Sequence, residues 1–102
     1  MIHQLIAPDE LEHFCRRWDV SELSLFGSAL REDFEPDSDI DLLVTFLPQA
    51  DWGLLDHIQM ELELTQLLGR DVDLLTRRAV ERSENPIRRQ EILDTAQTIF
   101  HL

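Results

Sequence analysis

The stretch GSALREDFEPDSDIDLLV, residues 27–44, places a Gly-Ser pair ahead of two alternating aspartates. Residues 22–26 (ELSLF) predict a short strand that runs directly into Gly27 and Ser28, and residues 39–46 (DIDLLVTF) predict the clearest strand of the chain. The intervening FEPDS is typical of a loop. A turn that closes one strand is therefore followed by a second strand that opens with carboxylates.

The aspartates at the start of the second strand share one of its faces. Side chains alternate along a strand, so Asp39 and Asp41 point the same way, roughly 7 Å apart, while apolar residues cover the other face. The later stretch DVDLLT, residues 71–76, repeats this pattern with Asp71 and Asp73. If the two strands are neighbours, three or four carboxylates converge. Such a cluster needs a compensating cation, for which Mg²⁺ is the usual choice.

The Gly27-Ser28 turn offers the complementary half of a nucleotide site. Backbone N–H groups at a turn from a strand into a helix can hold phosphates together with the Ser28 hydroxyl, because glycine lets the backbone approach closely. Two Mg²⁺ ions about 4 Å apart can clamp the attacking and leaving oxygens of a phosphoryl-type displacement. The pattern thus predicts that the turn holds the tail of a nucleoside triphosphate and that Asp39 and Asp41 hold the metals.

The remaining elements predict one α/β (α+β) domain over residues 1–102, in which helices pack on a small sheet. Helices are expected over about 8–18 and 52–68, and a last helix is expected to begin at Pro86. The long helix carries apolar residues at helical spacing at Leu54, Leu55, Ile58, Leu62 and Leu68. The apolar face of the last helix is expected to consist of Ile92, Leu93, Ala96, Ile99 and Phe100.

The composition of the chain indicates which cellular compartment and which classes of partner to expect. The formal charge of -12 disfavours direct binding to nucleic acid. No apolar run approaches the roughly 20 residues that span a bilayer, and the amino terminus lacks the basic start of a signal peptide. We therefore expect a cytoplasmic protein that does not bind membranes. Cys15 has no partner for an internal disulfide and is interpreted as a core residue.

Other catalytic chemistries find little support in the sequence. The four histidines have no partners at the spacing of a zinc site, and His57 is interpreted as structural. Ser28 does not lie in the G-x-S-x-G motif of a hydrolase. All nine basic residues are arginines, and six lie late in the chain, where they form either a solvated segment or a site for phosphate or an acidic partner: Arg70, Arg77, Arg78, Arg82, Arg88 and Arg89.

The compound pattern resembles the minimal nucleotidyltransferase family, single-domain relatives of the DNA polymerase β superfamily. The match consists of Gly27-Ser28, ten residues, and then Asp39-Ile40-Asp41, and GRDVDLLT, residues 69–76, looks like the strand that supplies the family's third carboxylate. The resemblance implies a nucleotidyltransferase (polymerase β-like) fold with a small mixed sheet flanked by helices.

The resemblance also implies roles for individual residues. Asp39 and Asp41 would be metal ligands, and Asp73 would be a third ligand or the general base. Gly27 and Ser28 would bind the triphosphate, and Arg31 would contact the nucleotide. The sequence departs from the family at Ala29 and Glu32, where an arginine and a glycine are common.

Minimal members of this family are often MntA-like antitoxins of HEPN/MNT toxin-antitoxin pairs. The resemblance therefore implies transfer of AMP from ATP to a hydroxyl, a tyrosine of an all-helical HEPN-type toxin, with release of pyrophosphate. The acceptor must be another molecule if it is a tyrosine, because this chain contains none. Two alternatives are a non-catalytic antitoxin that neutralises the toxin by binding, and a free-standing enzyme that modifies a small hydroxylated molecule.

Overall fold

The structure is a computed structural model that describes residues 6–26 and 39–102. Its helices are α2 (Pro8–Arg17), α3 (Leu54–Leu68), α4 (Arg77–Glu81) and α5 (Pro86–Thr95). Its strands are β1 (Val20–Phe26), β2 (Ile40–Phe46), β3 (Val72–Thr76) and β4 (Gln97–His101). Within these segments no helix combines the length and apolar character needed to cross a membrane.

The four strands form one mixed sheet in the order β3-β2-β1-β4. β1 is antiparallel to both β2 and β4, whereas β2 and β3 are parallel. A parallel pair needs a crossover connection, and α3 supplies it between β2 and β3. The predicted class, a small mixed sheet flanked by helices, is confirmed.

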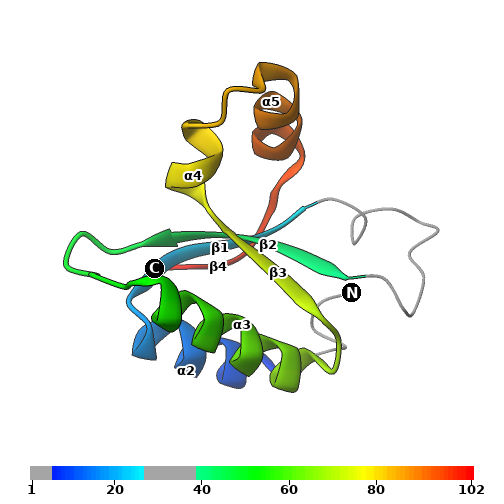
Figure 1. Ribbon diagram of the computed structural model, residues 1–102. Helices are drawn as coiled ribbons and strands as arrows, with labels where there is room; N and C mark the ends of the chain where they lie inside the picture. Colours follow the sequence, from blue (N-terminus) through cyan, green and yellow to red (C-terminus); the bar gives the residue numbers. More distant parts are fainter. Residues whose placement is uncertain (1–5, 27–38) are drawn as a thin grey trace.

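Helices cover both faces of the sheet, with α2 and α3 on one side and α4 and α5 on the other (Figure 1). The larger apolar cluster lies under α2 and α3 and includes the fully buried Leu23, Ile40 and Leu42. A smaller cluster on the opposite side consists of Phe26, Leu43, Val80 and Ile92. Successive residues of β2 thus enter different clusters, as the alternation of strand side chains requires.

Helix α2 follows its sequence signals closely. Pro8 occupies the first turn together with Asp9 and Glu10, which complement the positive end of the helix dipole. The helix ends at Arg17, one residue before the predicted end, and Trp18 forms its C-cap. The Trp52 indole packs edge-on against Trp18 and donates a hydrogen bond to the Trp18 carbonyl oxygen at 2.8 Å, which ties the loop before α3 to α2.

Cys15 lies in the core, as predicted, and burial raises the pKa of its thiol to about 12. The native protein should therefore resist alkylation by iodoacetamide at pH 8, whereas the unfolded chain reacts, because the thiolate is the reactive form. Since the pKa of the thiol in the folded protein lies above its ordinary value of 9.0, this group lowers the free energy of unfolding as the pH rises from about 9 to about 12. Mass spectrometry of the alkylated protein, with and without urea, is the check; equal labelling would show that Cys15 is accessible.

The five apolar residues that the sequence shows at helical spacing on α3 do not form its buried face. Met60, Leu64 and Leu68 are buried against the sheet. The other four of the five are exposed: Leu54, Leu55, Ile58 and Leu62. The helix carries two apolar stripes, and the one spaced at 60, 64 and 68 packs inward. The helix begins at Leu54 rather than at residue 52, because Asp56 accepts a hydrogen bond from the Gly53 N–H at 3.0 Å and caps it there.

The C-terminal segment also differs from the prediction. The last helix ends at Thr95, and Ile99 and Phe100 belong to strand β4 instead of its apolar face. β-Branched and aromatic residues favour a strand, and pairing of β4 with β1 stabilises it. In addition, the arginine-rich segment directly after β3 contains helix α4, which the sequence analysis did not predict and which Thr76 caps by accepting a hydrogen bond from the Ala79 N–H.

Candidate active site

Strands β2 and β3 bring two of the predicted carboxylates side by side. Asp41 and Asp73 are direct partners in the parallel register, and Asp41 is half-buried whereas Asp73 is exposed. Asp39 is exposed and immediately precedes β2. The Asp71 carbonyl oxygen accepts a hydrogen bond from the Ile40 N–H at 2.9 Å, which fixes the two strand starts against each other. The carboxylates therefore gather where β2 and β3 begin.

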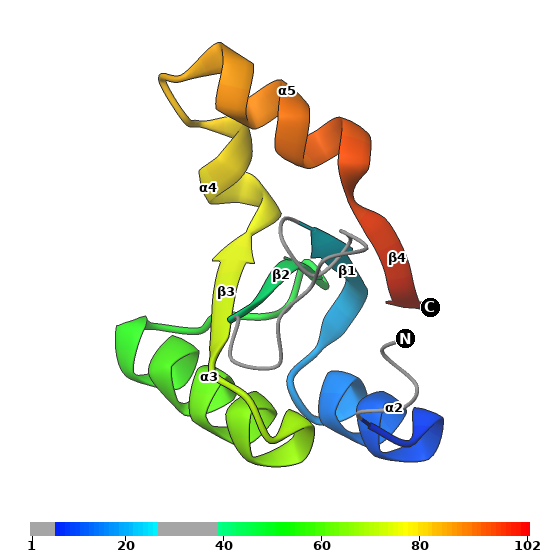
Figure 2. The same ribbon diagram turned by 90° about the vertical axis from the view of Figure 1, so that its right-hand side faces the viewer.

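The carboxylate-bearing face of the sheet has an apolar end and a polar end. Farther along the same strands, Leu43 is buried and packs with Val80 of α4 and Ile92 of α5. Helix α4 continues from the end of β3, and α5 lies beside it (Figure 2). These helices cover the apolar end, and within residues 6–26 and 39–102 the apolar cluster beneath them consists of Phe26, Leu43, Val80 and Ile92.

The donors at this site fit Mg²⁺ in chemical type. Carboxylate oxygens are the ligands that Mg²⁺ prefers, and it commonly takes only one or two of them together with waters and substrate phosphates. In residues 6–26 and 39–102, no three His, Cys, Asp or Glu side chains form a ready-made metal site. Asp41 and Asp73 could supply two carboxylates to such an ion.

The predicted phosphate-binding residues fall outside the structural description. Strand β1 ends at Phe26, which is the register partner of Asp41 on the side opposite β3. Gly27 and Ser28 come directly after Phe26 in the sequence, but these two residues and Arg31 lie outside the described residues. Their contacts with a nucleotide stay a prediction.

Two side chains of α3 brace the strand that carries Asp73. The His57 Nε2 donates a hydrogen bond to the Leu74 carbonyl oxygen at 2.7 Å, and the Glu61 carboxylate accepts one from the Leu74 N–H at 2.8 Å. β3 is an edge strand, so these bonds occupy backbone groups that would otherwise be open to another strand. Glu61 was not predicted from the sequence, although the i,i+4 spacing of the pair places both residues on one side of a helix.

Removing this brace should destabilise the edge strand. We expect His57→Leu and Glu61→Leu each to lower the free energy of unfolding by about 1–3 kcal/mol, because each leaves a part-buried backbone group without a partner. Glu61→Gln keeps an acceptor oxygen and should stay close to the parent. Urea unfolding and hydrogen exchange at the Leu74 amide measure the effect. Unchanged exchange in Glu61→Leu would show that the bond contributes nothing.

Five of the six late arginines lie on α4, on α5 or in the loop between them, and Arg70 lies between α3 and β3. Arg77 pairs with Glu22 at 3.5 Å and with Glu81 at 3.1 Å. Arg89 donates through Nη1 to the backbone carbonyl oxygens of Glu81 and Ser83, at 3.5 and 3.4 Å. Two members of the predicted cluster therefore support the local fold. The exposed members are Arg78, Arg82 and Arg88.

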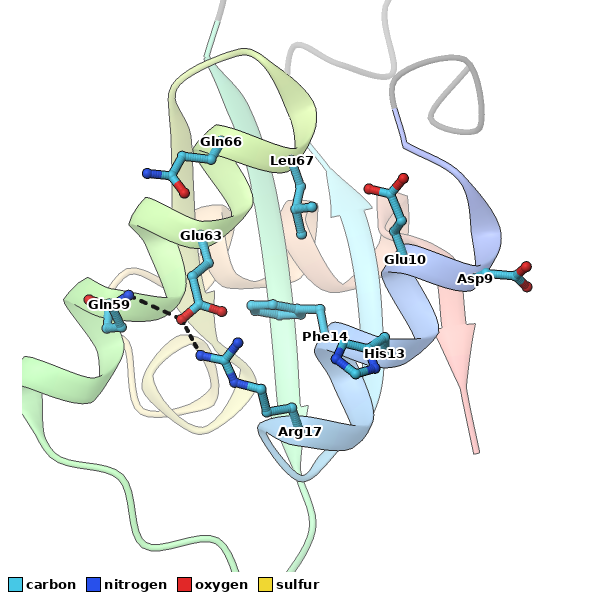
Figure 3. A pocket seen from close by; sticks show the side chains of 9 residues that line it. All are labelled: Asp9, Glu10, His13, Phe14, Arg17, Gln59, Glu63, Gln66 and Leu67. Atoms are coloured by element: carbon cyan, nitrogen blue, oxygen red, sulfur yellow. Dashed lines mark hydrogen bonds and ion pairs between the residues drawn. The ribbon is translucent and has the colours of Figure 1, made fainter.

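A groove of about 660 Å³ lies between α2 and α3 and is shown in Figure 3. Phe14 and Leu67 form its apolar floor, while Glu63 reaches in from α3 and pairs with Arg17. The helices α2 and α3 cover the sheet face opposite Asp41, so this groove is separate from the carboxylate site. Its size alone does not make it the nucleotide site.

Comparison with known proteins agrees with this geometry. The sequence pattern of the nucleotidyltransferase domain family matches residues 10–98. A protein of Methanocaldococcus jannaschii, provisionally named a protein adenylyltransferase, is 35% identical over 99 residues, covering 97% of this chain and 95% of that protein.

Solved structures share the fold. One, provisionally described as a minimal nucleotidyltransferase, is 33% identical, covers 88% of this chain and 86% of its own, and has a TM-score of 0.66. A crystal structure of a toxin-antitoxin with AMP-PNP covers 95% of this chain and 75% of its own at a TM-score of 0.71, and its 19% identity supports the fold alone. With a family pattern along most of its length and relatives that match nearly end to end, the chain belongs to the nucleotidyltransferase domain family, among its minimal members.

Proposed function

We propose that this chain is a Mg²⁺-dependent protein adenylyltransferase and an antitoxin. It transfers AMP from ATP to a hydroxyl, a tyrosine, of a partner HEPN-type toxin and thereby neutralises it. The observation that carries this proposal is the pairing of Asp41 with Asp73 on adjacent parallel strands, in a chain of the nucleotidyltransferase family. We expect the reaction to take place in the cytoplasm, where ATP is available.

The relatives support the substrate and the partner. The Methanocaldococcus jannaschii relative is named for the transfer of AMP to protein. The structure of similar fold in the toxin-antitoxin complex contains AMP-PNP, a nucleotide with the shape of ATP. A tyrosine acceptor on another protein is compatible with this chain, which has no tyrosine of its own to modify.

The chemistry is a displacement at the α-phosphorus of ATP. The acceptor oxygen forms a bond to that phosphorus, the bond from the α-phosphorus to the bridging oxygen breaks, and pyrophosphate leaves. The acceptor proton passes to the Asp73 carboxylate. Asp73 is exposed and is the register partner of Asp41, and this position suits a general base at the metal-binding residues. Asp39, Asp41 and Asp73 are the residues that would hold one or two Mg²⁺ ions, which when bound offset the negative charge of the triphosphate. Gly27, Ser28 and Arg31 would hold its terminal phosphates.

The exposed arginines are assigned to the triphosphate. Arg78, Arg82 and Arg88 belong to the segment that packs through Val80 and Ile92 on the carboxylate-bearing face. Changing all three to serine should weaken ATP binding about 10-fold, because guanidinium groups pair strongly with phosphate. Arg16→Ser, on α2 across the sheet, is the matched control. Isothermal titration with ATP is the measurement, and equal affinities would mean that the three arginines form a solvated face.

The proposed reaction is tested by the position of the label in ATP. The protein is incubated with Mg²⁺, the product of the neighbouring gene as candidate acceptor, and ATP labelled at either the α- or the γ-phosphate. Adenylyl transfer predicts a labelled partner with α-labelled ATP only, and labelled pyrophosphate with the γ-labelled form. Label from the γ-phosphate on the partner would identify a kinase instead. Modification of a small molecule without any labelled partner would favour the free-standing enzyme.

A further inference from the structure

The outward face of α3 is apolar and carries no charge. Leu54 and Leu55 are 76% and 82% exposed, and Ile58 and Leu62 are exposed as well. Together they form a stripe about 12 Å long at the helical rise of 1.5 Å per residue. We call Leu54, Leu55, Ile58 and Leu62 the α3 stripe. Contiguous exposed apolar residues of this kind mark a binding surface more often than scattered ones do.

The three acidic residues of α3 all form hydrogen bonds or ion pairs with other residues of this chain. Asp56 caps the helix through the Gly53 N–H, Glu61 holds the Leu74 N–H, and Glu63 pairs with Arg17 and accepts a hydrogen bond from the Trp18 indole. A helix on the surface of a chain with net charge -12 would ordinarily face solvent with its acidic side chains. The cores of protein–protein interfaces, in contrast, are depleted of charged residues, and the α3 stripe has this composition.

One flank of the α3 stripe is the groove between α2 and α3, whose charged lining of Asp9, Glu10, Glu63 and Arg17 is net acidic. Gln59 and Gln66 line this groove and follow Leu55 and Leu62 by one helical turn each. Figure 3 shows Glu10 and Glu63 on opposite walls above the apolar floor. A surface with an apolar stripe beside acidic walls is complementary to an apolar helix flanked by lysine or arginine.

The charge distribution argues against two other occupants. α3 contains no lysine or arginine, so it lacks the basic face by which amphipathic helices bind anionic lipid. A second copy would bring another net charge of -12 and the same acidic groove to the interface. A partner protein with an apolar helix flanked by basic residues would be complementary to both the α3 stripe and its acidic flank.

We propose that the α3 stripe and its acidic flank are the docking surface for an amphipathic, basic-flanked helix of the partner protein that accepts AMP. This inference rests on the proposed function only for the identity of the partner. The surface lies on the far side of the sheet from Asp41, so it holds the partner by binding energy that is separate from the chemistry.

Paired variants test the surface. Leu55→Ser combined with Leu62→Ser should weaken binding of the protein encoded by the adjacent gene by at least about 30-fold, the loss typical of a truncated central residue. Leu102→Ser is the matched control, because Leu102 is 59% exposed and follows β4 at the opposite edge of the sheet. Gln66→Lys should weaken binding, whereas Gln66→Glu should leave it unchanged or tighten it.

The outcomes separate this inference from the proposed function. Thermal unfolding and ATP binding by the isolated chain should match the parent in every variant, since the altered side chains are exposed. If the parent binds and modifies the partner while the Leu55/Leu62 variant binds it equally well, the docking surface is wrong and the proposed function stands. If that variant only converts a dimer of this chain into a monomer, the stripe is a self-interface. If the parent does not bind the partner at all, both proposals are wrong.

Discussion

Replacing Asp41 by alanine is expected to lower AMP transfer by at least on the order of 100-fold, because a group that stabilises charge at a reacting centre contributes this much or more. Asp41 lies between Phe26 and Asp73 in the register of the sheet, so its loss removes the central carboxylate of the site. The Asp39→Ala, Asp41→Ala double variant should leave no measurable transfer. Initial rates with labelled ATP give the result.

Stability should be retained in these variants. The core side of β2 is formed by Ile40, Leu42 and Val44, whereas Asp41 is on the other face and only half-buried. Replacing side chains on this face leaves the apolar core intact, so the variants should fold as the parent does. Asp51→Ala, which changes an exposed carboxylate in the loop before α3, is the matched control. Full transfer by the double variant would refute the assignment of this site.

Asp73→Asn is expected to reduce transfer at least about 10-fold more than Asp71→Asn. Asparagine keeps the shape of the side chain but removes its charge and its capacity to accept a proton at neutral pH. Asp73 is the register partner of Asp41, whereas Asp71 precedes β3 and contributes its backbone carbonyl oxygen to the Ile40 N–H. The difference between the two variants therefore reports on register rather than on charge in general.

The comparison requires both proteins to be equally folded and saturated with ATP. Rates measured at several ATP concentrations separate a loss of turnover from a loss of affinity. Equal losses in Asp73→Asn and Asp71→Asn would contradict the role given to Asp73.

The strands that carry the site were predictable because their pattern is local. Apolar residues alternate with aspartates at a period of two, and this identifies both the strand and the side of it that faces away from the core. The sequence also predicts that Asp73 is the deeper aspartate of its strand. The parallel register that places Asp73 opposite Asp41 depends on the α3 crossover and became visible only in the structure.

Other features depend on contacts between distant segments. Both stripes of α3 are apolar at helical spacing, and nothing within the helix distinguishes the one that packs on the sheet. The stripe containing Met60 and Leu64 packs inward, and His57 and Glu61 reach the edge strand beside it. Similarly, Ile99 and Phe100 continue an apolar pattern that suits a helix, but β1 has an open edge that pairs with them as β4. Contacts with distant segments therefore determine both which face of α3 is buried and that residues 97–101 form a strand.

Intact-mass spectrometry of the partner toxin is the most direct test of the central claim, that this chain neutralises the toxin by transferring AMP. The toxin is co-expressed with the parent protein or with the Asp39→Ala, Asp41→Ala variant, then purified and weighed. We predict mass increments of one or more AMP groups on a toxin tyrosine with the parent, and an unmodified toxin with the variant. An unmodified toxin in both preparations, with growth restored equally by both proteins, would contradict the claim and identify an antitoxin that acts by binding alone.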